Sequence, residues 1–254
     1  MLCSNSTGNS TGDPHDVSGD TVDRNLTGQF ASNSFAADFL AKLDLIATAA
    51  QAAARNCVRV LDVGTGTARI PIEICTRRGD IVVTAVDRAT RALQTARRNV
   101  EQAGMTCAIQ IEKADASSLP YANASFDAVI SSSLLHHVSN RHGVLTEMTR
   151  VLRPGGLLFV RDTLRGSDVQ KIAEVLSRSS CATHEARRAV FQRAFHAMPN
   201  VDEAREMALA AGLPAAWVRQ SGPRHWIICG RLPDFSPSGR SLDTGCRPFA
   251  PTRS

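Results

Sequence analysis

The sequence predicts an α/β fold built on a doubly wound, seven-stranded, mostly parallel sheet that ends in an antiparallel hairpin. Short apolar runs alternate with longer amphipathic stretches between residues 58 and 162, which is the order of βαβ units. Hydrophobic residues make up 43% of the 254 residues, enough for one substantial core. Two further apolar runs follow one another directly at 215–231, which favours a hairpin at or near the sheet edge.

The first half of the predicted fold consists of apolar runs that end in turn residues. In chain order we expect a helix at 35–54, a buried strand at 58–64, a helix at 68–78, a strand at 81–87 and a helix at 88–104. Strands and helices in this alternation form parallel units, so that helices cover both faces of the sheet. Right-handed crossovers then fix most of the topology.

The second half continues the alternation and then closes the sheet. We expect strands at 107–115 and 126–133, a helix at 141–152, a strand at 156–162, a helix at 200–212 and the two hairpin strands at 215–222 and 224–231. Asn200 is the expected N-cap of its helix, and Glu203 occupies the capping-box position.

The two ends of the chain differ in composition from the rest. Residues 1–24 and 233–254 are rich in small and polar residues, so we expect both segments to be disordered. The folded domain is expected at 25–232, with a helical insertion at about 167–198. The sequence does not indicate an oligomeric state.

Charge and cysteine content restrict the function classes. The net charge is +5 and the pI about 9.0, but the arginines are spread along the chain, which favours a solvated surface over a nucleic-acid site. We find no apolar run long enough for a membrane span and no secretory signal, so we expect a cytoplasmic protein. Four of the seven cysteines, Cys57, Cys75, Cys107 and Cys229, fall in apolar patterns and are expected to be buried free thiols. No ligand spacing for a metal is apparent.

The stretch VLDVGTGTARIPIEI at 60–74 suggests a ligand-binding turn. Gly64 and Gly66 allow the backbone to approach a ligand closely, as in dinucleotide-binding proteins, but Ala68 replaces the usual third glycine. Asp62 would repel a pyrophosphate and attract an amino group. Asp87 ends the second strand, where it can accept both hydroxyls of a ribose, and Asp115 ends the third, where it can accept the amine of an adenine. Capping of turns is the alternative role for Asp62 and Asp87.

With these residues in place, the chain resembles the class I S-adenosylmethionine-dependent methyltransferases, in particular the small-molecule type that includes the ubiquinone/menaquinone C-methyltransferases. The resemblance covers about residues 58–162 and rests on four motifs in order: LDVGTGTA, VDRA, DASSLPYANASFDAV and RVLRPGGLLFVRD. It implies a Rossmann-like fold and S-adenosyl-L-methionine as cofactor. The sequence departs from the first family motif at its last position, where this chain has alanine in place of glycine.

The resemblance also implies roles for individual residues. The expected cofactor-binding residues are Asp62 beside the amino group, Gly64, Thr65 and Gly66 along the methionine, Asp87 with Arg88 at the ribose, Asp115 and Ala116 at the adenine edge, and Ser131 near the sulfonium.

Candidates for a catalytic base follow the fourth and fifth predicted strands. His136 and His137 are adjacent, so they cannot both face the same way; we expect one to reach the pocket while the other packs or faces water. With Asp162 they are the catalytic candidates. Arg161 and Arg165, which flank Asp162, could bind an acidic substrate or form pairs within this group.

The acceptor is best predicted from what the chain lacks. Three serines at 131–133 stand where nucleobase amino-methyltransferases typically carry an Asn/Asp-Pro-Pro-aromatic run, and the Pro-Cys nucleophile of cytosine C5 enzymes is also missing. We therefore expect methyl transfer to a small molecule by in-line displacement, with nucleic acid an improbable partner. Two alternatives stay open: a methyltransferase that acts on protein or RNA, and a non-catalytic S-adenosylmethionine-binding protein.

Overall fold

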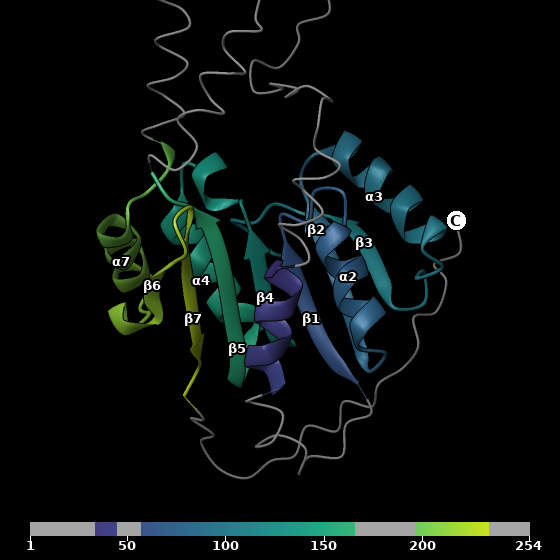
Figure 1. Cartoon of the computed structure of the whole chain (residues 1–254), viewed down its shortest axis with the longest axis horizontal. Coiled ribbons are helices and arrows are strands. Elements are labelled where there is room, and N and C mark those ends of the chain that lie inside the picture. The colour runs from purple at the N-terminus through teal and green to yellow at the C-terminus, as the bar shows by residue number, and fades with distance from the viewer. Residues whose placement is uncertain (1–33, 45–56, 166–196, 234–254) are drawn as a thin grey trace, which may run out of the picture.

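The structure, a computed structural model, describes residues 34–44, 57–165 and 197–233 (Figure 1). The terminal segments expected at 1–24 and 233–254 and the insertion expected at 167–198 fall almost entirely outside these ranges.

Seven strands form one sheet in the order β3-β2-β1-β4-β5-β7-β6. The strands are β1 (Val58–Val63), β2 (Ile81–Asp87), β3 (Ile109–Lys113), β4 (Phe126–Ser132), β5 (Leu152–Thr163), β6 (Val218–Ser221) and β7 (His225–Arg231). The first five are parallel, and β7 pairs antiparallel with both β5 and β6. This confirms the predicted mixed sheet, with the hairpin at its edge. Strands β2 and β3 are added on one side of β1, and β4 and β5 on the other. The boundary between β1 and β4 is therefore the switch point, where open α/β sheets bind ligands.

Helices cover both faces of the sheet, as predicted (Figure 1). On one face, α2 (Arg69–Arg77), α3 (Thr90–Gln102) and a helix at 34–44 bury Ile74, Ala96 and Phe35 in one core cluster. On the other face, α4 (Arg141–Val151) and α7 (Val201–Ala210) bury Met148 and Ala204 in a second cluster.

The ends of two helices show why the sequence starts them there. In α7, Asn200 Oδ1 accepts from Glu203 N (2.8 Å), and Asn200 N donates to Glu203 Oε2 (3.1 Å), which confirms the predicted capping box. In α4, Asn140 Oδ1 accepts from Gly143 N (3.0 Å). These caps satisfy amide groups that the first helical turn leaves unpaired.

Two of the cysteine predictions are wrong. Cys57 is disulfide-bonded rather than free, and Cys107 is exposed because β3 begins only at Ile109. Cys75 and Cys229 are free and partly buried, and burial raises the pKa of the Cys75 thiol to about 12. Within 34–44, 57–165 and 197–233, no helix is both long and apolar enough to cross a membrane.

Candidate active site

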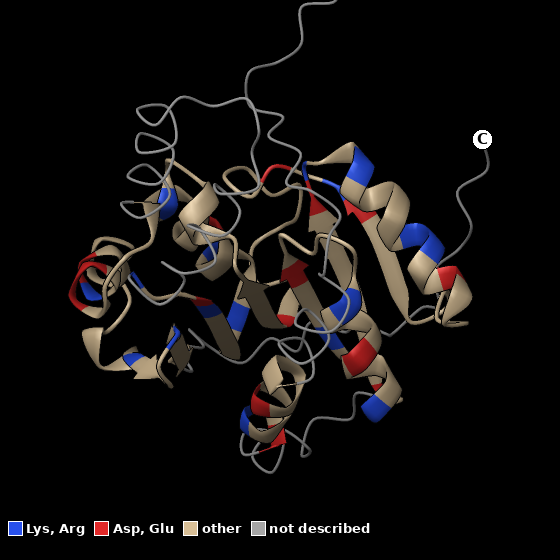
Figure 2. Ribbon diagram, turned by 45° about the horizontal axis from the view of Figure 1, so that its top comes forward, with Lys and Arg blue, Asp and Glu red and all other residues tan. Residues whose placement is uncertain are grey.

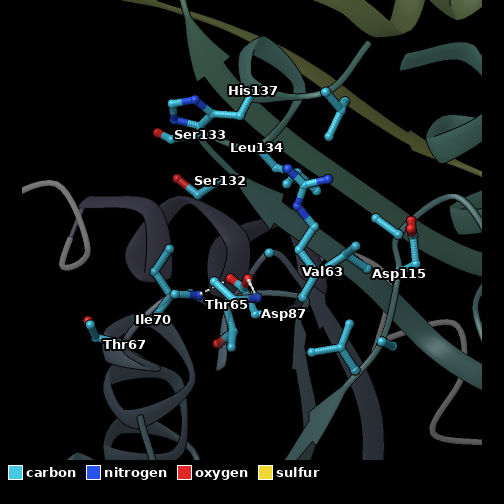
Figure 3. Close-up of a pocket in the computed structure, with 18 of the residues that line it drawn as sticks. Val63, Thr65, Thr67, Ile70, Asp87, Asp115, Ser132, Ser133, Leu134 and His137 are labelled. Atoms are coloured by element: carbon cyan, nitrogen blue, oxygen red, sulfur yellow. Dashed lines mark hydrogen bonds between the residues drawn. The ribbon is translucent and has the colours of Figure 1, made fainter. Parts of the chain in front are cut away.

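A cavity of about 550 Å³ opens at the carboxyl ends of the strands, beside the switch point (Figure 3). It is lined by residues that follow β1, β2, β3 and β4. Seven of the nine predicted cofactor-binding residues line it, namely Gly64, Thr65, Gly66, Asp87, Arg88, Asp115 and Ala116. The sheet therefore brings together side chains that are far apart in the sequence.

The turn after β1 is held in a left-handed backbone conformation. Gly64 and Gly66 have φ of 78° and 57°, and Ala68, which caps α2, has φ of 61° although it carries a side chain. The amides of Gly64 and Thr65 both donate to Val86 O at 2.9 Å, which ties the turn to β2. Ala68 thus takes a left-handed conformation that glycine adopts more readily.

Asp62 lies under this turn rather than in the cavity wall. Its side chain is almost completely buried, and its Oδ2, like Thr65 Oγ1, has no hydrogen-bond partner among the residues that the structure describes. Burial raises the pKa of Asp62 to about 7; the adjacent Thr65 hydroxyl opposes this shift, and the nearby Asp87 carboxylate adds to it. A cationic donor placed above the turn would satisfy this oxygen and favour the ionised carboxylate.

Asp87, at the end of β2, braces the same turn from the side. Its Oδ2 accepts from Gly66 N (2.9 Å) and its Oδ1 from Ala89 N (2.9 Å). A carboxylate oxygen has a second lone pair, so both oxygens can still accept from hydroxyl groups in the cavity. Arg88 follows as an exposed side chain of the cavity wall.

Asp115 and Ala116 follow β3, and Figure 3 places Asp115 at the end of the cavity opposite Thr67. Asp115 Oδ1 accepts from both the amide (2.8 Å) and the hydroxyl (2.7 Å) of Ser117. The bond from the Ser117 hydroxyl, and to a smaller extent the bond from its amide, hold the pKa of Asp115 below its usual range. The carboxylate is therefore ionised at neutral pH.

The end of β4 differs from the expectation for Ser131. Its side chain is fully buried and donates to Val63 O (2.8 Å), so it links β4 to β1 beneath the cavity. Ser132, Ser133 and Leu134 line the cavity instead, and Ser133 has φ of 56°. None of these three residues was among the predicted cofactor-binding or catalytic residues. The run of three identical serines carries no signal for which of them turns inward.

The two adjacent histidines separate as expected. His137 lines the cavity (Figure 3). His136 does not line it and places its Nδ1 2.5 Å from Asp162 Oδ1. Asp162 is fully buried and also accepts from the amide of Leu135 (2.6 Å), so it fixes the turn that carries the histidine pair.

The two rings are 3.9 Å apart between centroids. His137 is exposed at the cavity mouth, but partial desolvation by the groups around it, followed by the neighbouring His136, lowers the pKa of its imidazole to about 4, so it is neutral at neutral pH.

Within the described part of the chain, neither of the two arginines that flank Asp162 lines the cavity, and neither forms an ion pair with Asp162. Arg161 Nη1 donates to Ser34 Oγ (3.0 Å), and its guanidinium lies 4.9 Å from the centre of the Phe35 ring. Arg165 pairs with Glu203 (2.6 Å). Both arginines therefore fasten helices to the sheet. Among the described residues, no cluster of three or more His, Cys, Asp or Glu could hold a metal ion.

Comparisons with known proteins agree with this arrangement. Residues 61–160 match the family model described as a methyltransferase domain. The chain is 37% identical to the 27-O-demethylrifamycin SV methyltransferase of Amycolatopsis mediterranei over 106 residues, which is 42% of this chain and 39% of that protein. It is 38% identical to the demethylmenaquinone methyltransferase of Deinococcus radiodurans over 114 residues, 45% of this chain and 46% of that protein.

The chain thus spans less than half the length of these relatives. Among solved structures, a SAM-dependent methyltransferase from Aquifex aeolicus superposes with a TM-score of 0.52 at 16% identity, covering 73% of this chain and 87% of that one. This likeness concerns the fold. Together, the matched model and the similar proteins show a methyltransferase domain at residues 61–160, and the solved structure shows that its fold is that of S-adenosylmethionine-dependent methyltransferases.

Proposed function

We propose that this protein transfers the methyl group of S-adenosyl-L-methionine to a small molecule whose reacting atom carries an acidic proton, such as a hydroxyl. The observation that carries the proposal is one cavity whose wall joins a glycine turn, two carboxylates and a histidine. The buried Asp62 carboxylate lies under the same turn.

The cofactor is assigned to the side of the cavity formed by β1, β2 and β3. Asp62 would bind the ammonium of the methionine moiety, since its Oδ2 and the nearby Thr65 Oγ1 both lack partners in the part of the chain that the structure describes. Asp87 would accept the ribose hydroxyls, and Asp115 the amine of the adenine. When bound, the cofactor supplies a methyl group already activated by a positively charged sulfur. The protein must then align the acceptor and exclude water.

The acceptor is assigned to the side formed by the turn after β4. Ser132, Ser133 and His137 offer hydrogen-bonding groups there, and neutral His137 can accept from a hydroxyl. His137 is therefore the candidate proton acceptor, and Asp162, which contacts the Nδ1 of His136 and accepts from the amide of Leu135, would fix the turn that carries it. As the carbon–oxygen bond forms and the carbon–sulfur bond breaks, the acceptor proton would pass to His137.

A small acceptor is favoured over a polyanion by the charge distribution. Figure 2 shows Lys and Arg positions spread over several helices and strands with acidic positions between them, not gathered on one face. Two similar proteins are named as methyltransferases of 27-O-demethylrifamycin SV and of demethylmenaquinone, which are small molecules.

The proposal is tested with a panel of small phenols, alcohols and quinols and a cofactor that carries an isotopically labelled methyl group. We expect labelled product from at least one acceptor class with the wild type. His137→Ala, on the acceptor side of the cavity, should lower kcat about 10²–10⁴-fold, the usual contribution of a positioned base, with unchanged S-adenosylhomocysteine affinity. Asp202→Ala, which changes an exposed carboxylate on α7, is the control. Transfer to RNA or protein but to none of the small acceptors would refute the proposal.

A further inference from the structure

The loop between β3 and β4 forms the cavity wall that we assign to the adenine. It begins with Ala114, whose amide donates to Asp87 O (3.1 Å), and continues through the wall residues Asp115 and Ala116. Among the described residues, the Asp115 carboxylate accepts hydrogen bonds only from Ser117, which belongs to the same loop. The position of this carboxylate therefore depends on what fixes the rest of the loop.

Two charged residues of α4 hold the middle of the loop. Leu119 N donates to Glu147 Oε2 (2.7 Å), and Arg150 Nη2 donates to Leu119 O (3.0 Å). The other terminal nitrogen, Arg150 Nη1, donates to Tyr121 O (2.7 Å) and to Asn123 Oδ1 (2.9 Å). One guanidinium thus binds three successive parts of the loop.

The two charged residues also bind each other through two contacts. Arg150 Nε lies 2.7 Å from Glu147 Oε1, and Nη2 lies 2.8 Å from Oε2. The Arg150 guanidinium lowers the pKa of Glu147, so the pair stays charged across the physiological range. Their side chains are 29% and 18% exposed, and a pair at such positions contributes little by itself. Here, however, the pair satisfies both the N–H and the C=O of Leu119, a buried residue.

Neither Arg150 nor Glu147 lines the cavity. We propose that Arg150, oriented by Glu147, is a positioning residue that fixes the loop at 114–125 so that Asp115 meets the amine of the adenine. Arg150 then affects which nucleobase the cavity prefers and does not affect binding of the methionine moiety. This inference rests on the proposed function, because it takes the cavity to bind S-adenosylmethionine.

The test compares two probes by calorimetry: S-adenosylhomocysteine and S-inosylhomocysteine, in which a carbonyl oxygen replaces the adenine amine. The wild type should bind the adenosyl compound more tightly. Arg150→Ala should lose about tenfold in affinity for it, the effect of one charge-assisted hydrogen bond, and much less for the inosyl compound, so that the preference shrinks. Glu147→Gln, a milder change, should reduce the preference in the same direction. Arg77→Ala, which removes an exposed Arg–Glu pair within α2, should leave it unchanged.

The outcomes separate this inference from the proposed function. A general loss of folding would weaken both probes by the same factor, and that result would overturn the positioning role. Wild-type affinity in Arg150→Ala, or no preference for adenine in the wild type, would also overturn it. If the wild type bound neither probe, the proposed function itself would fail.

Discussion

Gly64 offers the sharpest test of the turn that forms the floor of the cavity. A Cβ added at this position would lie 2.9 Å from Leu134 Cδ1 and 3.1 Å from Leu134 Cβ, and φ is 78°. Gly64→Ala therefore combines left-handed strain, which costs about 1–2 kcal/mol, with overpacking against Leu134, which costs about 1–3 kcal/mol. At Gly66, φ is 57° but an added Cβ meets nothing within 4 Å, so only the first cost applies.

Urea denaturation of the ligand-free protein measures the difference between the two variants. Gly64→Ala should lower the free energy of unfolding by about 2–5 kcal/mol, and Gly66→Ala by about 1–2 kcal/mol. Gly79→Ala is the matched control, since Gly79 has neither a left-handed φ nor a close neighbour. Equal destabilisation at the two turn glycines would refute the contact with Leu134.

Three further predictions follow from other parts of the structure. Because the pKa of Asp62 is raised to about 7, neutral Asp62 stabilises the ligand-free fold fully below about pH 4, and this stability is lost as pH rises through 7. Asp62→Asn should flatten that decline in urea midpoints measured between about pH 5 and pH 8, and an unchanged slope would contradict the assignment. Calorimetry in buffers of different ionisation enthalpy should show proton release when the cationic cofactor binds near pH 7, and none in Asp62→Asn. Gly230→Ala should destabilise the hairpin by about 1–3 kcal/mol or more, since the added Cβ would lie 1.9 Å from Trp217 Cδ2. In a Trp217→Ala background, the same change should cost much less. Additive free energies in the double variant would refute the contact.

Much of the fold could be predicted because local pattern and tertiary structure agree. Parallel strands buried on both faces appear as nearly continuous apolar runs, as in β2. The capping box of Asn200 and Glu203 is also a local signal. The state of Cys57 depends on tertiary contacts, and no local pattern reveals it.

The candidate site was less fully predictable, for a geometric reason. The carboxylates at strand ends are placed by the sheet, so Asp87 and Asp115 reach the cavity. After β4 the chain leaves regular structure at Ser133, in a left-handed conformation that the sequence does not announce for a non-glycine residue. Which serine lines the cavity, and which histidine meets Asp162, follow from that turn. The contacts of Arg150 likewise depend on how a loop lies against α4.

The account depends most on the claim that the cavity at the switch point binds an S-adenosyl compound. Calorimetric titration with S-adenosylhomocysteine and with NAD tests it directly. We predict one site for S-adenosylhomocysteine, no measurable binding of NAD, and a loss of about 1–3 kcal/mol of binding free energy in Asp87→Ala. Tight binding of NAD together with no binding of S-adenosylhomocysteine would contradict the account.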